Sequence, residues 1–331
     1  MINKKMNLRE NLFEVKEKSP TRDGFGKGSV EAGKADSRVV VLTADLAEST
    51  RADSFQKMFP ERFIQVGVAE QNMVTVAAGM AVYGKIPFIT SYATFSPGRN
   101  WEQIRTTVAI NNVPVKICGM HAGLLTGQDG ATHQALEDIA IMRAMPNMVV
   151  ISPSDAEEGR KATQAAAKFP GPVYLRFARD KTPLITTTET PFEIGKANVL
   201  WHPSSSGEKS QVAIFATGPL VHNALLAARE LESKGVAVSV ANVHTIKPLD
   251  EETIVSLARE SGAVVTVEEH QANGGLGGAI AELLAKRCPT PMEFVGIQDK
   301  FGQTGEPAEL WEYYGLGVGH IVETVQRVRG R

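Results

Sequence analysis

Short apolar runs alternate with longer stretches of helical periodicity through the first half of the chain. The runs are rich in β-branched residues and nearly continuous in hydrophobicity, which is typical of parallel strands buried on both faces. Strands are predicted over 38–45, 62–67, 86–93, 113–120, 147–154 and 172–177, and helices over 70–83, 99–111, 134–145 and 155–168. The alternation predicts a doubly wound α/β domain, which binds ligands beyond the carboxyl ends of its strands.

This periodicity fails after about residue 180, where Thr, Ser, Pro and Gly predominate. We therefore predict an N-terminal helical extension over 1–20, a first domain over 21–180, a linker over 181–209 and a second α/β domain over 210–331. In the second domain, strands are expected over 211–218, 237–243, 263–269 and 292–297, and helices over 219–234, 250–261, 276–287 and 319–329.

Composition narrows the choice of partner and compartment. The net charge of −2 gives no electrostatic footprint for nucleic acid or for an anionic membrane, and no apolar run approaches the length of a membrane span. The basic N-terminus has no apolar stretch behind it, so it does not resemble a secretory signal. Two distant cysteines, Cys118 and Cys288, fit reduced thiols. We expect a cytoplasmic protein whose ligands are small molecules.

One acidic residue, Glu70, opens a helix that is otherwise almost free of charge. A carboxylate there complements the helix dipole, and from this stretch alone that interpretation is favoured. The alternative is functional. A carboxylate at a strand end, backed by apolar side chains, is desolvated, so its pKa tends upward and it can share a proton with a ligand nitrogen.

A polar, glycine-rich segment, "HAGLLTGQDGATHQALED", follows the fourth predicted strand. It holds His121, Asp129 and His133, which are suited to binding sugar hydroxyls and to transferring protons. The alternative is a plain turn, with Asp129 and Gly130 as turn residues and Thr132 as a helix N-cap. That alternative leaves the two histidines unexplained.

Further polar and aromatic side chains follow other strands. They are Asp45 and Ser49 after the first strand, Tyr92, Phe95 and Arg99 after the third, and Arg176 and Arg179 after the sixth. Each has a structural alternative, such as a cap, core packing or a surface ion pair. Together they place acids, aromatics, histidines and arginines at one edge of the sheet. This mixture suits a phosphorylated polyol better than a metal ion, and we predict no metal ligand.

Three segments carry a resemblance to a known family: "SYATF", "GQDGATHQALEDIAIMRAMPNMVVISPSD" and "FGQTGEPAELWEYYGLG". They resemble the pyrimidine-binding domain of transketolase followed by the transketolase C-terminal domain, over roughly residues 20–330. The D-G-x-T-H-Q segment is shared with deoxyxylulose-phosphate synthase, so it marks the broader group.

The resemblance implies dependence on thiamine diphosphate, with the pyrimidine end bound by this chain. Glu70 then matches the glutamate that contacts N1′ of the aminopyrimidine. Phe95 matches the aromatic residue that stacks on that ring, and Tyr92 is a further cofactor-binding residue. Asp129 and His133 match residues that bind the sugar hydroxyls.

The sugar-phosphate end is implied in the same way. His121, Ser49 and Arg179 match positions near it, with Arg176 as a close alternative to Arg179. Arg22 lies 23 residues before Asp45, the spacing that the family uses for another phosphate-binding arginine. His133, together with His121, is expected to move protons on the sugar oxygens.

The family's diphosphate-binding motif is missing. The sequence has "RDG" at 22–24 and "QDG" at 128–130 but no G-D-G followed by an Asn. The resemblance therefore implies a separate N-terminal subunit that binds Mg²⁺ or Ca²⁺, in an α2β2 heterotetramer with this chain dimerised. A truncated protein is the alternative.

The expected reaction is transfer of a two-carbon ketol unit from a ketose phosphate to an aldose phosphate. Three other functions stay open: a 2-oxo-acid dehydrogenase β subunit, a deoxyxylulose-phosphate-synthase-like enzyme, and a non-catalytic partner subunit.

Overall fold

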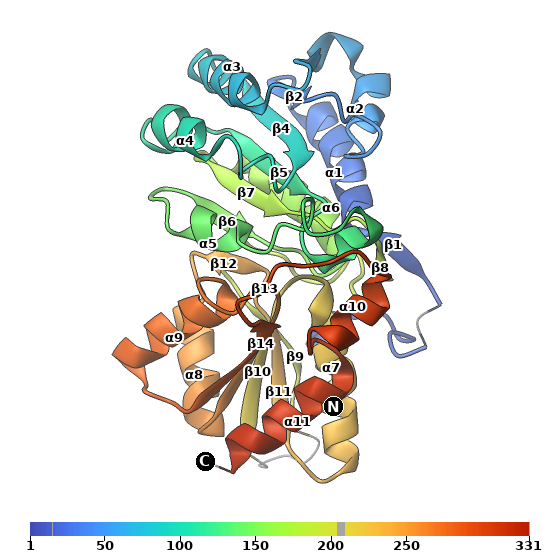
Figure 1. Cartoon of the computed structure of the whole chain (residues 1–331), viewed down its shortest axis with the longest axis vertical. Coiled ribbons are helices and arrows are strands. Elements are labelled where there is room, and N and C mark those ends of the chain that lie inside the picture. The colour runs from blue at the N-terminus through green and yellow to red at the C-terminus, as the bar shows by residue number, and fades with distance from the viewer. Residues whose placement is uncertain (15, 204–208, 331) are drawn as a thin grey trace.

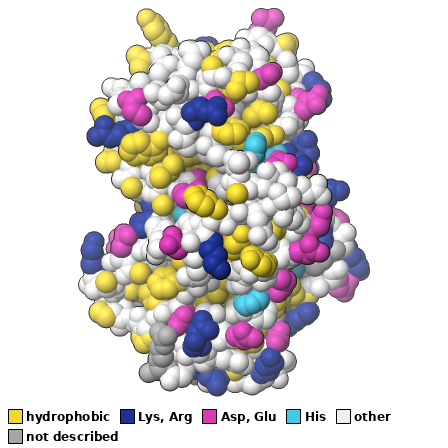
Figure 2. Space-filling view, in the orientation of Figure 1, with side chains coloured by type: hydrophobic (Ala, Val, Ile, Leu, Met, Phe, Trp, Pro, Cys, Tyr) yellow, Lys and Arg dark blue, Asp and Glu magenta, His cyan; other side chains and the backbone are white. Residues whose placement is uncertain are grey.

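The computed structural model describes residues 1–14, 16–203 and 209–330, which fold into two α/β domains stacked end to end (Figure 1). Residue 15 of the predicted extension, 204–208 of the predicted linker and residue 331 of the second domain lie outside the described residues. Figure 2 shows basic and acidic side chains interspersed over both domains, as the small net charge leads one to expect.

The first domain is built on a seven-stranded sheet in the order β12-β6-β7-β5-β4-β2-β3. Six of its strands are parallel and confirm the six predicted ones: β2 (Val39–Thr43), β3 (Phe63–Gln65), β4 (Ile86–Tyr92), β5 (Lys116–Met120), β6 (Val149–Ile151) and β7 (Val173–Arg176). Their parallel arrangement brings all six carboxyl ends to one edge, where ligands bind in such sheets.

Helices cover both faces of this sheet: α1 (Thr21–Ala35), α2 (Asp53–Met58), α3 (Glu70–Val82), α5 (Asp138–Arg143) and α6 (Ala156–Lys168). The helix predicted over 99–111 is instead α4 (Trp101–Gln103) followed by a π-helical segment, Ile104–Ala109. The helix predicted from 134 begins at Asp138, because the Gln134 side chain bonds to the backbone of Gly127 and Gln303 and holds that segment as a loop.

The predicted N-terminal helical extension is wrong. The described part of 1–20 contains a 3₁₀ turn at Lys4–Met6 and a strand, β1 (Lys18–Pro20), while the helix α1 begins only at Thr21. Four glycines within α1 lower its intrinsic helix propensity, so the sequence pattern did not predict this helix.

Two of those glycines allow α1 to approach α6 closely. A Cβ at Gly24 would overlap the carbonyl oxygen of Ala156, and one at Gly28 would lie 2.7 Å from the carbonyl oxygen of Arg160. The packing therefore depends on glycine at both positions, and tertiary contact outweighs the poor propensity.

The second domain has a five-stranded sheet in the order β14-β13-β10-β11-β9. Its predicted strands are confirmed as β10 (Val212–Ala216), β11 (Val238–Asn242), β13 (Val264–Gln271) and β14 (Met292–Ile297). The helices α8 (Glu251–Ser261) and α9 (Leu276–Arg287) lie on one side of this sheet, and α7 (Val221–Ser233) and α11 (Val318–Arg329) on the other (Figure 1). A short helix, α10 (Pro307–Tyr313), was not predicted.

The predicted linker is partly wrong, because it contains two strands. β8 (Lys181–Pro183) pairs with β1, and β9 (Asn198–Trp201) pairs antiparallel with β11 in the second sheet. Both are short, and their Thr- and Pro-rich surroundings gave no period-two signal.

The two domains share a strand and a core. β12 (Thr245–Lys247) belongs to the second domain in sequence but pairs antiparallel with β6 in the first sheet. One apolar cluster contains Met142 and Val150 of the first domain together with Ile246 and Ile254 of the second. The domains therefore meet through a continuous hydrophobic core rather than through a loose linker.

The α1–α6 contact generates a prediction about stability. Gly24→Ala forces a methyl group against the backbone of α6 and should lower the free energy of unfolding by about 1–3 kcal/mol. Gly79→Ala is the matched control, since a Cβ there meets nothing within 4 Å on an exposed face of α3. It should raise stability by about 0.5–1 kcal/mol. Urea unfolding measures both, and equal effects would contradict the close-packing argument.

Candidate active site

Glu70 is the first residue of α3, and only 2% of its surface is exposed. Its carboxylate accepts hydrogen bonds from Arg99 Nη1 at 2.8 Å and from Ser91 Oγ at 3.3 Å. Asn100 Nδ2 also donates to its backbone carbonyl oxygen at 3.1 Å. Because Ser91 lies near the end of β4 and Arg99 follows that strand, the carboxylate is directed toward the ligand edge of the sheet.

The Arg99 guanidinium lies between Glu70 and an aromatic ring. Its central carbon is 4.7 Å from the centroid of Phe95, and its side chain is 48% exposed. A flat nitrogen–carbon–nitrogen group is thus held by a buried carboxylate and an aromatic residue together. Glu70 and Phe95, far apart in sequence, therefore form one compact site.

An aromatic and histidine cluster continues from Phe95 along the strand ends. Tyr92 lies 6.1 Å from Phe95 and 3.9 Å from His121, measured between ring centroids, and His133 meets Phe95 edge-on at 5.4 Å. The structure therefore brings together four side chains that sequence analysis assigned to the site. Thr132, a helix N-cap in the alternative interpretation, does not cap α5, which begins at Asp138 with Glu137 before it. The Thr132 hydroxyl contacts Nδ1 of His133 at 2.9 Å.

His121 is a buried, neutral histidine. Burial, followed by the positive charges of Arg22 and Arg179, lowers the pKa of His121 to about 2. Arg22 Nη1 lies 3.0 Å from Nε2, so Nε2 accepts and Nδ1 carries the hydrogen. Nδ1 is buried and has no hydrogen-bond partner among the residues described. Neutral His121 is therefore suited to donate a hydrogen bond from Nδ1, and its predicted proton-transfer role stays a prediction.

Arginines gather beyond His121. Arg22 Nη1 donates to the carbonyl oxygen of Ser49 at 2.7 Å, and Arg179 Nη1 donates to that of Thr126 at 2.8 Å. Burial and the charge of Arg51 lower the pKa of Arg22, whose Nε is buried and has no partner within the described chain. Asp129 is 3.9 Å from Arg179. The predicted phosphate-end residues are thus clustered, with positive charge in excess.

Arg51 is a member of this cluster that sequence analysis missed. It follows Ser49 by two positions and is held by Asp23 at 2.7 Å. Only its position after the first strand of the domain could have indicated that Arg51 belongs to the site.

Arg176 and Arg179 have different environments, although they are three residues apart. Arg176 is 4% exposed; it donates to the Asp138 carboxylate at 2.9 Å and to the carbonyl oxygens of Ala135 and Glu269. The Arg179 side chain is 39% exposed at the ligand edge. The structure therefore places Arg179, not Arg176, where an anion can reach it.

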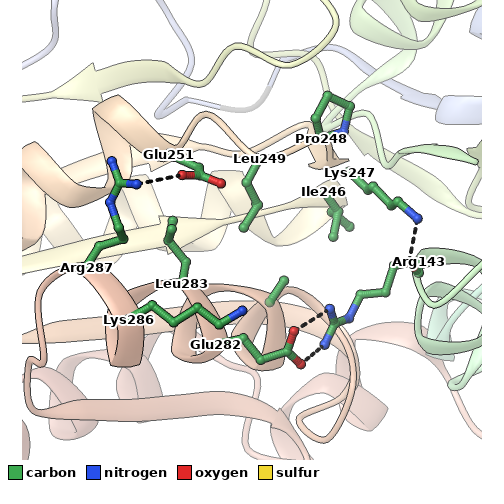
Figure 3. A pocket seen from close by; sticks show the side chains of 11 residues that line it. Arg143, Ile246, Lys247, Pro248, Leu249, Glu251, Glu282, Leu283, Lys286 and Arg287 are labelled. Atoms are coloured by element: carbon green, nitrogen blue, oxygen red, sulfur yellow. Dashed lines mark hydrogen bonds and ion pairs between the residues drawn. The ribbon is translucent and has the colours of Figure 1, made fainter. Parts of the chain in front are cut away.

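A hollow of about 450 Å³ lies elsewhere, at the junction of the two domains (Figure 3). Its charged side chains are largely engaged with one another. Arg143 pairs with Glu282 at 2.5 Å, and Lys247 Nζ donates to the carbonyl oxygens of Arg143 and Met145. These contacts fasten α9 and β12 to the end of α5, and no residue of the strand-end cluster lines this hollow.

The described residues contain no group of three or more His, Cys, Asp and Glu side chains that could hold a metal ion. No helix among them is both long and apolar enough to cross a membrane.

Comparison with known proteins identifies the family to which both domains belong. Residues 17–184 match the family model "Transketolase, pyrimidine binding domain", and residues 205–321 match "Transketolase, C-terminal domain". The chain belongs to the transketolase family, whose domains are thiamine dependent.

Similar proteins include separate subunits. A putative transketolase C-terminal section from Methanocaldococcus jannaschii is 46% identical, covering 92% of this chain and 94% of the relative. The 6-deoxy-6-sulfo-D-fructose transketolase subunit SqwH from Clostridium sp. is 41% identical, covering 96% and 98%. A solved structure described as a split-gene transketolase, an inactive β4 tetramer, has a TM-score of 0.86 and 43% identity, covering 94% and 98%.

The two arginines give a matched pair of substitutions. Arg176→Met leaves Asp138 buried without its ion-pair partner and should lower the free energy of unfolding by about 3–5 kcal/mol. Arg179→Met removes a half-exposed charge and should change it by less than about 1 kcal/mol. Chemical denaturation of the two variants tests this, and similar losses would refute the separate roles.

The state of His121 gives a second test. Its imidazole should stay neutral from pH 8 to about pH 4 in nitrogen-15 spectra, since its folded pKa of about 2 lies below the ordinary 6.5. The stability that it contributes is complete above pH 6.5 and is lost as the pH falls toward 2. Arg22→Gln should raise the pKa of His121, whereas the exposed Arg38→Gln should leave it unchanged. Protonation of His121 near pH 6 in the parent protein would contradict the assignment.

Proposed function

We propose that this chain is the C-terminal subunit of a thiamine-diphosphate-dependent transketolase that acts only with a separate N-terminal subunit. The enzyme transfers a two-carbon ketol unit from a ketose phosphate to an aldose phosphate. The chain contributes the pyrimidine end of the cofactor site and much of the sugar site.

The observation that carries this proposal is the placement of Arg99. Its planar guanidinium is bound by the Glu70 carboxylate and lies against Phe95. An aminopyrimidine has the same nitrogen–carbon–nitrogen unit, so these residues fit the ring that the family binds. Arg99 is half-exposed and can leave when a ligand ring takes its place.

In this proposal Glu70 holds a proton at N1′ of the ring, Phe95 supports one ring face, and Tyr92 packs behind Phe95. Thiamine diphosphate supplies the nucleophilic carbon and the electron sink that carbon–carbon bond cleavage needs. Displacement of Arg99 leaves the carboxylate without its cationic partner in a buried position, which favours sharing a proton with the ring nitrogen.

The sugar occupies the adjoining part of the edge. Asp129 and His133 bind its hydroxyls, and His133 transfers protons to and from the sugar oxygens. Neutral His121 donates a hydrogen bond from Nδ1. Arg22 and Arg179 bind the terminal anion by charge-assisted hydrogen bonds, beside the backbone of Ser49.

The diphosphate and its Mg²⁺ or Ca²⁺ are assigned to the N-terminal subunit, in an α2β2 assembly where this chain is dimerised. The lack of a G-D-G motif in the sequence supports a second chain. The inactive β4 tetramer described for a chain 43% identical also supports it, because that protein assembles without activity.

A sulfonated donor is a second candidate substrate. The 41% identical Clostridium subunit is described as a 6-deoxy-6-sulfo-D-fructose transketolase subunit. Sulfonate and phosphate both present oxygen acceptors to arginines, so the cluster of Arg22, Arg51 and Arg179 suits either group.

Reconstitution tests the function. Co-expressed with its N-terminal partner and supplied with thiamine diphosphate and Mg²⁺, the chain should cleave a ketose phosphate, whereas the chain alone should not. Glu70→Gln should lower kcat by about 10²-fold or more, because proton transfer at the ring nitrogen is lost. Glu102→Gln, at a nearby exposed site, should retain parental activity.

Three donors distinguish the alternatives: a ketose phosphate, the matching 6-sulfonate and a 2-oxo acid. Near-parental activity of Glu70→Gln would refute the assigned role of Glu70. Turnover of the 2-oxo acid alone would favour a dehydrogenase or synthase subunit instead.

A further inference from the structure

The loop over 121–136, which carries His121, Asp129 and His133, lies between the two domains. In Figure 1, α10 of the second domain lies directly below this loop. Its polar residues belong to the candidate active site, but much of its other side is in contact with the second domain.

The apolar side chains of the loop are part of the second domain's core. Leu124 and Leu136 are at most 1% exposed and belong to the same apolar cluster as Ile297 and Leu310. Gln271 donates its backbone N–H to the carbonyl oxygen of Leu136 at 2.9 Å. Both ends of the loop are therefore anchored in the second domain.

Glu269 contacts the middle of the loop backbone. It lies in β13 and is 2% exposed. Its Oε1 accepts hydrogen bonds from the backbone N–H of Leu125 at 2.7 Å and from Trp311 Nε1 at 3.0 Å. A Cβ at Gly123 would lie 2.5 Å from the same carboxyl group, so the loop backbone is in close contact with the Glu269 side chain.

The segment after β14 supports the far end of the loop. Gln134 Nε2 donates to the carbonyl oxygen of Gln303 at 3.0 Å, and Gln128 donates to Glu306 at 2.7 Å. A Cβ at Gly130, next to Asp129, would lie 2.6 Å from Thr304 Oγ1. The turn that presents Asp129 and His133 is thus packed against residues more than 160 positions away.

We propose that Glu269 is a positioning residue: from the second domain it fixes the backbone of the 121–136 loop and so aligns Asp129 and His133 for the sugar. The proposal rests on the proposed function for the identity of the ligand. It makes the second domain part of the active-site support rather than an appendage.

The neighbouring Glu268 provides the comparison that isolates this role. It is equally buried, but its carboxylate accepts from the backbone N–H groups of Leu276 and Gly277 at the start of α9, at 2.7 Å each. Burial raises the pKa of Glu268 to about 8 and that of Glu269 to about 7. Both positions carry a similar desolvation cost, yet only Glu269 contacts the loop.

The test uses the reconstituted enzyme with four variants. Glu269→Leu should raise KM for the donor sugar by about tenfold, with a smaller change in kcat, because binding to the loop is weakened. Glu269→Gln should keep KM at the parental value, since the amide oxygen of glutamine can accept both hydrogen bonds. Glu268→Leu should lower stability without raising KM. Gly302→Ala would displace the Gln134 side chain, which supports the C-terminal end of the loop, and should also raise KM.

Hydrogen exchange of this chain alone provides a readout that does not need activity. Peptides within 121–136 should lose about tenfold or more of their protection in Glu269→Leu, but not in Glu268→Leu. If Glu269→Leu does not fold, Gly302→Ala decides the question by the same two measurements.

Equal KM values for Glu269→Leu and the parent, or unchanged loop protection, would overturn the proposal. Equal increases in KM for Glu268→Leu and Glu269→Leu would also overturn it, since they would indicate general destabilisation. Loss of loop protection in a complex that turns over no sugar would leave the support role standing and refute the proposed function.

Discussion

A buried arginine, Arg176, connects the two domains and the loop between them. Arg176 comes from β7 in the middle of the first sheet, and its guanidinium reaches the Asp138 carboxylate and the carbonyl oxygens of Ala135 and Glu269. It therefore connects the sheet, the end of the 121–136 loop and the second domain at one point. Burying two charges is costly, and the arrangement is stable only because several hydrogen bonds accompany the ion pair. Removing one partner would disturb three elements at once.

The candidate site has two electrostatic ends joined by aromatic rings. At one end the carboxylate of Glu70 is compensated by Arg99, and at the other three arginines surround a neutral histidine. Tyr92 and Phe95 fill the space between. Such a division suits a nitrogen heterocycle at one end and an anion at the other, as the proposed function requires.

The fold was largely predictable because strands of a parallel sheet are continuous apolar runs. The helix α1 was not, since its glycines serve contact with α6 rather than helix propensity. The placement of Glu70, Phe95 and the histidines at one edge of the sheet was predictable because each follows a strand, whereas their roles were implied only by the family resemblance. The difference between Arg176 and Arg179 was not, because it depends on burial. The contact of Glu269 with Leu125 joins residues 144 apart, and no local pattern contains it.

The shared strand has a consequence for synthesis of the chain. The first sheet lacks its edge strand β12 until residue 247 has left the ribosome, and Leu124 and Leu136 have no core to enter until α10 and β14 are made. The loop over 121–136 can therefore reach its native packing only after most of the second domain has been made, although it is encoded near the middle of the chain. While residues 137–306 are being synthesised, the nascent chain cannot bury these two leucines in their native core, and this makes the loop the natural point at which a chaperone would engage it.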